Sequence, residues 1–196
     1  LFIDVGTNSE IVLGSSARAL ACAAPAGPAF EAAQIRCGMR AAEGAIEGVK
    51  IVDGDVQLTV IGDVEPQGLC GSGLVDAVAE LVGAGILDHS GRFVAGSSDR
   101  LDKVGEETVF HLADCVYHSQ RDVRELQFAK ASIANGWQIL CRQLGIDPSE
   151  IARLGAAADL GIGAVRRLWQ PLPKSRDDAY TESVGEALAW MRTDEY

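Results

Sequence analysis

The chain has 196 residues, of which 47% are hydrophobic and 23% are charged. This length and balance are typical of one globular domain, with or without an appendage, and exclude a disordered or collagen-like chain. Because 17 Lys and Arg stand against 28 Asp and Glu, the formal net charge is -11, which argues against a nucleic-acid partner. The longest apolar stretch, 19–30, is too short to span a membrane and contains proline and glycine, so no membrane partner is predicted either.

The first elements predicted are a strand over 1–5, a turn over 6–9 and a returning strand over 10–14. The Ala-rich stretch 15–24 suits either a short helix or a strand, and one helical turn is predicted over 30–35.

A second hairpin pairs 48–52 with 55–61, because Asp53-Gly54 between them is a favoured two-residue turn. Apolar and polar residues alternate in its second strand, which is therefore expected to be half-buried. A glycine-rich loop over 66–73 then opens a helix that ends at Gly85. The apolar face of that helix is formed by Leu74, Val75, Val78, Leu81 and Val82.

Polar residues indicate a surface excursion over 88–107, followed by short strands over 108–112 and 115–117. Ser119 is predicted to cap a long helix, with Asp122 as its partner in a capping box. The stripe of this helix that faces the core consists of Leu126, Ile133, Trp137, Leu140 and Leu144.

The cysteines carry no recognisable metal or disulfide pattern. There are five of them, Cys22, Cys37, Cys70, Cys115 and Cys141, with no C-x-x-C pair. The odd number and the spacing indicate neither a disulfide framework nor a zinc or iron–sulfur site. Reduced thiols packed as small hydrophobic side chains are the simplest interpretation, although any one of them is a candidate reactive thiol. With no secretory signal in view, these thiols predict a cytoplasmic protein.

The first candidate for chemistry is Asp4-Val5-Gly6-Thr7-Asn8, where a strand carries an acidic residue and a tight turn follows. Backbone amides and the Thr7 hydroxyl can hold phosphate oxygens, and Gly6 lets a phosphate approach the backbone closely. Asp4 can hold Mg²⁺ directly or through water, because that ion prefers carboxylate and water oxygens. The same residues also suit an ordinary hairpin turn, and these five residues alone do not decide between the two interpretations.

The second candidate is Gly68-Leu69-Cys70-Gly71-Ser72-Gly73, which opens a helix. Amides at a helix N-terminus attract anions, and glycines permit close approach. The loop matches neither the Walker motif nor the dinucleotide fingerprint, and such a loop also serves simply to connect a strand to a helix. Cys70 is a candidate for either an activated thiol or a packing role.

The remaining polar residues are interpreted without a catalytic role. The polar and charged side chains on or beside the long helix are expected to be mainly solvated; they are Gln120, Asp122, Glu125 and Lys130. The histidines form neither a ligand-spaced cluster nor a Ser-His-Asp arrangement; they are His89, His111 and His118.

Five longer motifs connect these pieces. They are LFIDVGTNSEIVLG (1–14), CAAPAGPAFEAA (22–33), GMRAAEGAI (38–46), PQGLCGSGLVDA (66–77) and RDVRELQFAKASI (121–133). In this order they resemble the carboxy-terminal domain of reductive activators of corrinoid proteins. That family is part of the ASKHA superfamily, which includes acetate and sugar kinases, Hsc70 and actin.

The resemblance implies a ribonuclease-H-like α/β lobe of the actin, sugar kinase and Hsp70 ATPase type. It predicts a mixed sheet with packed helices over 1–154 and a divergent tail over 155–196, and it leaves open whether the tail is part of the same lobe. It also implies that ATP binding and hydrolysis drive an electron from a [2Fe–2S] cluster to the cob(II)alamin of a corrinoid protein. Complete members of the family hold this cluster in an amino-terminal ferredoxin-like domain, and their middle domain carries a phosphate loop of its own.

By this resemblance, Asp4, Gly6, Thr7 and Asn8 form the second phosphate loop of a nucleotide cleft, with Asp4 as catalytic residue and Mg²⁺ ligand. Gly71, Ser72 and Gly73 form a neighbouring loop of the same ATP site. One Asp-x-Gly-Thr loop and no ferredoxin cysteine spacing are present. The chain is therefore expected to act with the amino-terminal and middle domains of the same polypeptide, and alone to bind ATP weakly and reduce nothing. Its oligomeric state is left open, a homodimer included.

The resemblance weakens after Leu154. The family's Ala-Gly-Ala-Phe-Gly turn, which resembles an adenosine-binding motif, corresponds here to LGAAADLG (154–161), and the Phe is missing. Either a diverged adenosine contact or a shifted reading frame explains this loss. One more helix is predicted over 181–192. Two other classes of function stay open: an ASKHA-type kinase or ATPase lobe without a corrinoid role, and a non-catalytic interaction domain.

Overall fold

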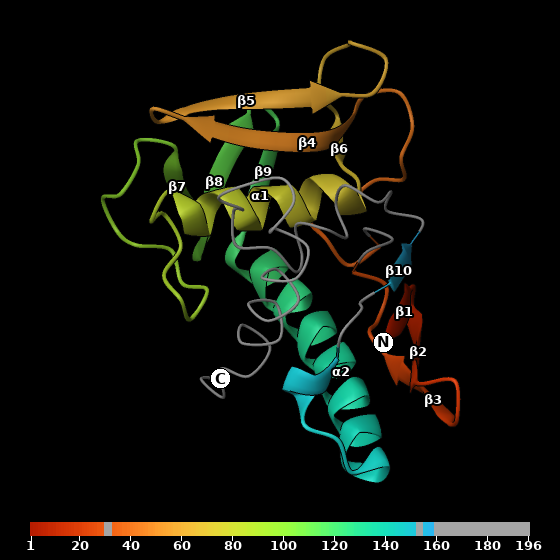
Figure 1. Cartoon of the computed structure of the whole chain (residues 1–196). Helices are drawn as coiled ribbons and strands as arrows, with labels where there is room; N and C mark the ends of the chain where they lie inside the picture. Colours follow the sequence, from red (N-terminus) through yellow and green to blue (C-terminus); the bar gives the residue numbers. More distant parts are fainter. Residues whose placement is uncertain (30–32, 152–154, 159–196) are drawn as a thin grey trace. The chain divides into compact units, whose positions relative to one another are not determined.

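A computed structural model describes residues 1–29, 33–151 and 155–158 of the chain (Figure 1). The helix predicted over 181–192 lies outside these residues, as does part of the turn predicted over 30–35. The chain divides into two compact units. Unit 1 is formed by residues 1–27 and 128–196, and unit 2 by residues 28–127.

Unit 1 is built on a mixed sheet with the strand order β10-β1-β2-β3. Strands β1 (Phe2–Val5), β2 (Asn8–Gly14) and β3 (Ala19–Pro25) are antiparallel neighbours, whereas β10 (Gly155–Ala158) pairs with β1 in parallel. The predicted opening hairpin is confirmed, and β3 decides the ambiguous Ala-rich stretch in favour of a strand.

One face of this sheet carries the core of unit 1. Ile3 and Ile11 are fully buried there and lie opposite each other in the register of β1 and β2. Helix α2 (Gln120–Leu144) contributes its residues from 128 onward to this unit. Gly136 allows close packing, because a Cβ at this position would lie 2.4 Å from Cδ1 of Ile11. The Ser132 hydroxyl donates to the carbonyl oxygen of Pro25 at 2.9 Å and further attaches the helix to β3.

The predicted apolar stripe of the long helix is confirmed for its main members. Leu126, Ile133, Trp137 and Leu140 are buried, with Trp137 fully so, and Leu144 is partly exposed. The 3-10 turn η1 (Pro148–Glu150) follows the helix. Of the helices described, none has the length and apolar composition needed to cross a membrane.

The described part of unit 2 contains two three-stranded sheets. In the first, β4 (Ala45–Val52) pairs antiparallel with β5 (Asp55–Val60) and parallel with the short β6 (Gly68–Leu69). The turn between β4 and β5 has positive φ at both Asp53 (52°) and Gly54 (89°), as a type I′ turn requires, so the predicted two-residue hairpin is confirmed. Val56, Leu58 and Val60 are half-buried, as expected.

Helix α1 (Gly71–Gly83) lies along the β5-β4-β6 sheet (Figure 1). Leu74, Val75 and Leu81 are buried as predicted, whereas Val82 is 37% exposed and does not belong to the apolar face. Gly85 has a φ of +70°, and its amide donates to the carbonyl oxygen of Val82 at 3.0 Å. The predicted end of the helix is thus confirmed, since glycine adopts this left-handed conformation without a steric penalty.

The second sheet of unit 2 is antiparallel and has the order β7-β8-β9. Its strands are β7 (Leu101–Val104), β8 (Glu107–Ala113) and β9 (Val116–Ser119). The predicted surface segment 88–107 is mostly exposed, but it contains the strand β7, which was not predicted. Most side chains of β7 are exposed, so no apolar pattern in its sequence indicates a strand. Its extended conformation is stabilised by the pairing with β8.

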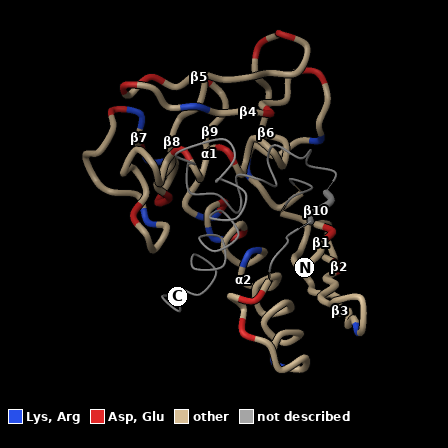
Figure 2. The backbone as a smooth tube through the Cα atoms, in the orientation of Figure 1, with Lys and Arg blue, Asp and Glu red and all other residues tan. Residues whose placement is uncertain are grey.

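The acidic excess is spread over the exposed turns of unit 2 (Figure 2). Examples are Asp53 and Asp55 at the tip of the β4–β5 hairpin, and Asp63 and Glu65 after β5. This arrangement keeps like charges in water, where their repulsion is weak.

Candidate functional site

The first predicted site lies at the turn between β1 and β2 in unit 1. Asp4, Thr7 and Asn8 are exposed, whereas Val5 and Ser9 point to the buried side. The turn is held to the rest of the unit, because the Gly27 amide donates to the carbonyl oxygen of Thr7 at 3.0 Å. The structure therefore places Asp4, Thr7 and Asn8 at exposed positions in and beside one turn.

Gly6 is tightly placed within this turn. A Cβ at Gly6 would lie 3.3 Å from the carbonyl oxygen of Asn8, and the Ser9 hydroxyl contacts the carbonyl oxygen of Gly6 at 3.4 Å. A side chain at this position would crowd the turn. The exposed side chains at this turn carry the carboxylate, hydroxyl and amide groups that suit a phosphate–Mg²⁺ group.

The second predicted site, the glycine-rich loop, lies in unit 2. It comprises β6, the N-cap residue Cys70 and the first turn of α1. Gly71 and Gly73 are buried, and Ser72 is partly exposed. A Cβ at Gly73 would lie 2.1 Å from the carbonyl oxygen of Ile46 in β4. This glycine therefore lets α1 approach the sheet closely, and among the three predicted residues Ser72 has a side chain that reaches the surface.

Cys70 is part of the packing at this loop. It is 3% exposed, its thiol donates to the carbonyl oxygen of Ile46 at 3.4 Å, and its Sγ lies 3.1 Å from the Ser72 Oγ. Between the two roles considered for Cys70, the geometry matches a packed thiol.

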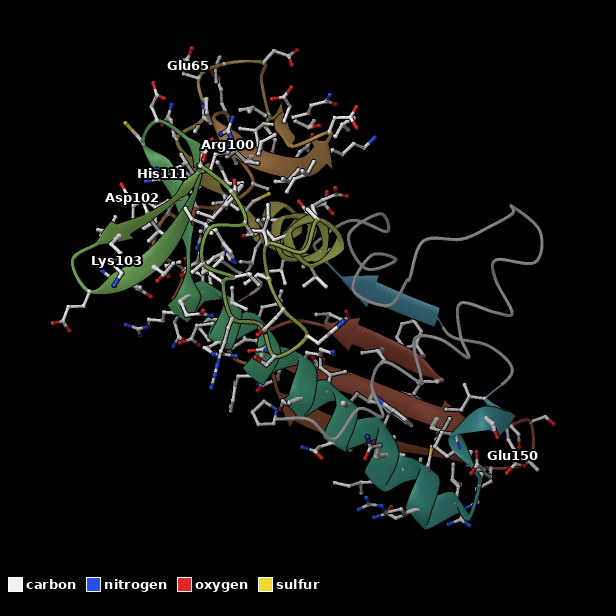
Figure 3. The ribbon with its side chains drawn as sticks, turned by 90° about the vertical axis from the view of Figure 1, so that its left-hand side faces the viewer. Glu65, Arg100, Asp102, Lys103, His111 and Glu150 are labelled. Atoms are coloured by element: carbon white, nitrogen blue, oxygen red, sulfur yellow. The ribbon has the colours of Figure 1, made fainter. Side chains whose placement is uncertain are left out.

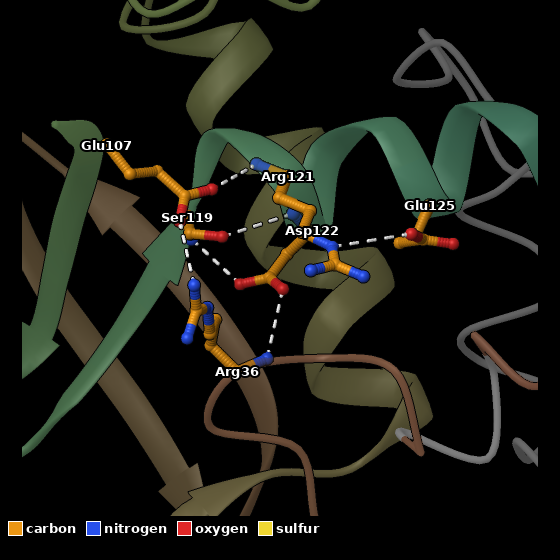
Figure 4. A network of polar contacts seen from close by, with 6 residues as sticks. All are labelled: Arg36, Glu107, Ser119, Arg121, Asp122 and Glu125. Atoms are coloured by element: carbon orange, nitrogen blue, oxygen red, sulfur yellow. Dashed lines mark hydrogen bonds and ion pairs between the residues drawn. The ribbon is translucent and has the colours of Figure 1, made fainter.

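A polar network at the start of α2 was not singled out from the sequence as a site (Figure 4). Asp122 is fully buried, and its carboxylate accepts hydrogen bonds from the amides of Arg36 (3.0 Å) and Ser119 (2.8 Å). The Asp122 amide in turn donates to the Ser119 hydroxyl at 3.2 Å, which confirms the predicted capping box. The interpretation of Asp122 as a solvated charge is wrong, because its carboxylate replaces water with backbone amides from two segments of the chain.

Two arginine side chains of the same network form ion pairs with glutamates. The Arg36 guanidinium lies 3.6 Å from Glu107, whose other carboxylate oxygen accepts from the Arg121 amide at 2.9 Å, and Arg121 also lies 3.7 Å from Glu125 (Figure 4). Arg36 and Arg121 are more than half exposed, so these ion pairs contribute little to stability. The sequence signal was the spacing of Ser119 and Asp122, which indicates a cap but not the contact with Arg36.

His118 lies beside the same carboxylate. Its side chain is fully buried, its Nδ1 is 3.9 Å from the Asp122 carboxylate, and within the described residues neither ring nitrogen has a hydrogen-bond partner. Burial lowers the pKa of His118 to about 4, because the charged imidazolium is poorly solvated there, and the nearby Asp122 opposes this shift. His118 is therefore a neutral core residue at physiological pH.

The histidine on β8 is held in a different way (Figure 3). Nε2 of His111 lies 3.9 Å from the Asp102 carboxylate, and the Arg100 guanidinium donates to the carbonyl oxygen of His111 at 3.3 Å. These contacts are partly exposed and link β7 to β8. In the part of the chain that the structure describes, no group of three or more His, Cys, Asp or Glu side chains is placed to hold a metal ion.

The comparisons with known proteins agree on one family. A family model described as the C-terminal domain of RACo, the ASKHA domain, matches residues 1–163. The chain is 35% identical over 179 residues to the corrinoid activation enzyme RamQ of Eubacterium limosum, covering 82% of this chain and 30% of that protein. Among solved structures, a reductive activator for corrinoid, iron-sulfur protein matches with a TM-score of 0.78 and 31% identity, covering 97% of this chain and 33% of that one.

The mixed sheet with packed helices is an ASKHA fold of the ribonuclease-H-like α/β class, as predicted. The chain belongs to the family of C-terminal ASKHA domains of RACo. It spans about a third of the length of the relatives that it matches.

Proposed function

We propose that this chain is the nucleotide-binding lobe of an ATP-dependent reductive activator of a corrinoid protein. The observation that carries the proposal is the β1–β2 turn, where Asp4, Thr7 and Asn8 are exposed around the tightly placed Gly6 in a domain of the ASKHA class. Support for the corrinoid role comes from the names of the relatives, a corrinoid activation enzyme and a reductive activator for corrinoid, iron-sulfur protein.

The residues of the turn suit distinct roles toward a triphosphate. Asp4 would hold Mg²⁺ directly or through water, the amides after Gly6 would bind phosphate oxygens, and Thr7 and Asn8 would donate from their side chains. Mg²⁺ supplies charge neutralisation to the phosphates when it is bound. In unit 2, Gly71, Ser72 and Gly73 are proposed as further nucleotide-binding residues, with the Ser72 hydroxyl as donor.

The remaining parts of the activity are assigned to other segments of a longer protein. We place the [2Fe–2S] cluster in an amino-terminal ferredoxin-like domain and a second phosphate loop in a middle domain, both in the same polypeptide. ATP-dependent movement of the present lobe relative to the middle domain would then favour electron transfer to cob(II)alamin of the corrinoid protein. The proposed location is the cytoplasm, because all five cysteines are free thiols, the usual state of cysteines in that compartment.

Exchange of Asp4 in the full-length protein tests this function. Asp4→Asn removes the charge that would hold Mg²⁺, so ATP hydrolysis and the loss of cob(II)alamin absorbance in the presence of ATP and reductant should both fall about a hundredfold. Glu10→Gln is the matched control, because Glu10 is exposed and lies opposite Asp4 in the register of β1 and β2.

Three outcomes would contradict the proposal or part of it. Unchanged ATP hydrolysis in Asp4→Asn would point to a non-catalytic interaction domain. A second outcome is that Asp4→Asn loses ATP hydrolysis, but the parent protein shows no ATP-dependent change in cob(II)alamin absorbance. This would indicate an ASKHA-type ATPase or kinase lobe without a corrinoid role. Isothermal titration of the present chain should show only weak ATP binding, and micromolar affinity would contradict the need for a second lobe.

A further inference from the structure

Two cysteines that are far apart in the sequence meet in unit 2. Cys115 lies in the exposed two-residue turn between β8 and β9, and Cys37 lies in the segment that leads to β4. The Sγ of Cys37 is 4.0 Å from the carbonyl oxygen of Cys115. Because a carbonyl oxygen is roughly 2.4 Å from its own Cα, the Cys37 sulfur lies at most about 6.4 Å from the Cys115 Cα.

The backbone on the Cys37 side is firmly held. The carbonyl oxygen of Cys37 accepts from the Leu69 amide at 2.7 Å, and the Met39 amide donates to the carbonyl oxygen of Leu69 at 2.8 Å, so the segment is fixed to β6. Cys115, by contrast, lies on a turn that follows a register shift between His111 and Ala113. A disulfide needs Cα atoms about 4.4–6.8 Å apart, so the closeness of the Cys37 sulfur to the Cys115 backbone makes these two cysteines the candidate pair for one.

The other cysteines lack this arrangement. Cys70 and Cys141 are buried, and Cys70 has its thiol bonded to the carbonyl oxygen of Ile46. Cys22 belongs to unit 1, where its thiol donates to the carbonyl oxygen of Gly136 at 3.6 Å. The interpretation of all cysteines as small buried side chains is therefore wrong for Cys115, which is exposed.

We propose that Cys37 and Cys115 form a redox-sensitive dithiol, which low-molecular-weight disulfides such as glutathione disulfide convert to an intramolecular disulfide. This proposal stands independently of the nucleotide site. It assigns a modification site to the segment that carries Arg36, whose amide binds the buried Asp122.

The reaction proceeds by two thiol–disulfide exchanges. The exposed Cys115 thiolate attacks one sulfur of glutathione disulfide and releases one glutathione, leaving a mixed disulfide on Cys115. Cys37 then attacks the Cys115 sulfur and releases the second glutathione. The two protein thiols are oxidised by two electrons in total, their two protons pass to the released thiolates or to solvent, and the glutathione disulfide is reduced to two thiols.

The order of the two steps follows from exposure and chemistry. Burial raises the pKa of the Cys37 thiol above its ordinary value, with the Tyr117 amide opposing the shift, so Cys37 is protonated and slow toward external reagents at neutral pH. Its closeness to Cys115 compensates in the second step, because an intramolecular attack has a high effective concentration.

Mass spectrometry of tryptic peptides tests the proposal directly. Trypsin places each of the five cysteines in a different peptide, with Cys37 in 37–40 and Cys115 in 104–121. The reduced chain is incubated with excess glutathione disulfide, its remaining thiols are blocked, and it is digested without reductant. We expect one new species, 37–40 joined to 104–121, and three blocked cysteines.

Single variants separate the two steps. Cys37→Ser should stop at a stable glutathione adduct on Cys115, and Cys115→Ser should leave Cys37 blocked by the alkylating reagent and free of glutathione. Cys22→Ser is the matched control and should form the cross-link as the parent chain does. Five blocked cysteines, a persistent glutathione adduct on Cys115 of the parent chain, or a cross-link between other cysteines would each overturn the proposal.

Discussion

Gly73 shows how a single residue can satisfy a motif and a packing requirement together. It was singled out as part of a glycine-rich anion loop, yet its buried position beneath β4 already requires the absence of a side chain. A Cβ there would lie 2.1 Å from a backbone oxygen of Ile46, an atom that cannot move without shifting the strand. The glycine would be needed even in a domain that binds no nucleotide.

Replacing Gly73 by Ala should therefore destabilise the chain. We expect the free energy of unfolding to fall by about 1–3 kcal/mol, because overpacking forces backbone shifts. Gly83→Ala in the same helix is the control: nothing lies within 4 Å of a Cβ at Gly83, and the exchange should raise stability by about 0.5–1 kcal/mol. Urea denaturation of both variants measures the difference, and equal effects at the two positions would contradict the packing argument.

At the scale of elements, α1 completes the hydrogen bonding of β4. Strand β6 pairs only with Ala45 and Ile46 of β4, so it does not reach the later amides of that strand. Two carboxylates one helical turn apart take its place: Asp76 accepts from the Val49 amide at 3.4 Å, and Glu80 accepts from the Ile51 amide at 2.8 Å. The acidic residues of α1 thus cover part of a strand edge that would otherwise need another strand or water.

Removal of the Glu80 acceptor should weaken this attachment. Glu80→Met keeps the length of the side chain but leaves the Ile51 amide without its partner, and we expect a loss of about 1–2 kcal/mol in the free energy of unfolding. Glu80→Gln retains an oxygen acceptor and should lose less than half as much. Denaturant titrations together with hydrogen exchange at Ile51 provide the measurement. If Gln and Met cost the same, the carboxylate does not stabilise β4 through this hydrogen bond.

The elements also show what could be predicted from the sequence. Local signals were sufficient for the Asp53-Gly54 turn, the Gly85 helix end and the Ser119–Asp122 cap, because each depends on residues close together in the chain. They failed for β7, whose order comes from its partner β8. They also failed for the burial of Asp122, which depends on an amide at Arg36, 86 positions away.

For the candidate site, the sequence predicted which residues share a turn but not what surrounds them. Asp4, Gly6, Thr7 and Asn8 are adjacent in the chain, so their meeting follows from the hairpin alone. The approach of Cys37 to Cys115 could not be inferred from spacing, because it depends on how β6 and the β8–β9 turn are placed within unit 2. Contacts of this kind need the tertiary structure.

At the scale of the whole molecule, the buried His118 links the stability of the chain to pH. Its pKa is about 4 in the folded state and about 6.5 when exposed, so the unfolded chain binds a proton more readily between these values. The free energy of unfolding is therefore unaffected by His118 above pH 6.5, where the imidazole is neutral in both states. It falls as the pH decreases from 6.5 toward 4, because the unfolded chain is protonated first, and the full loss is reached below pH 4. Up to about 3 kcal/mol of the free energy of unfolding should depend on this residue across the window.

Chemical denaturation at pH 7 and pH 4.5 tests this linkage, because carboxylates shared by all variants cancel in the comparison. His118→Phe cannot be protonated, so its loss of stability between the two pH values should be smaller than that of the parent chain. His89→Asn, at an exposed position, should lose as much as the parent. If His118→Phe does not fold, NMR titration of the parent imidazole replaces it, and protonation of His118 near pH 6.5 in the folded chain would contradict the burial argument.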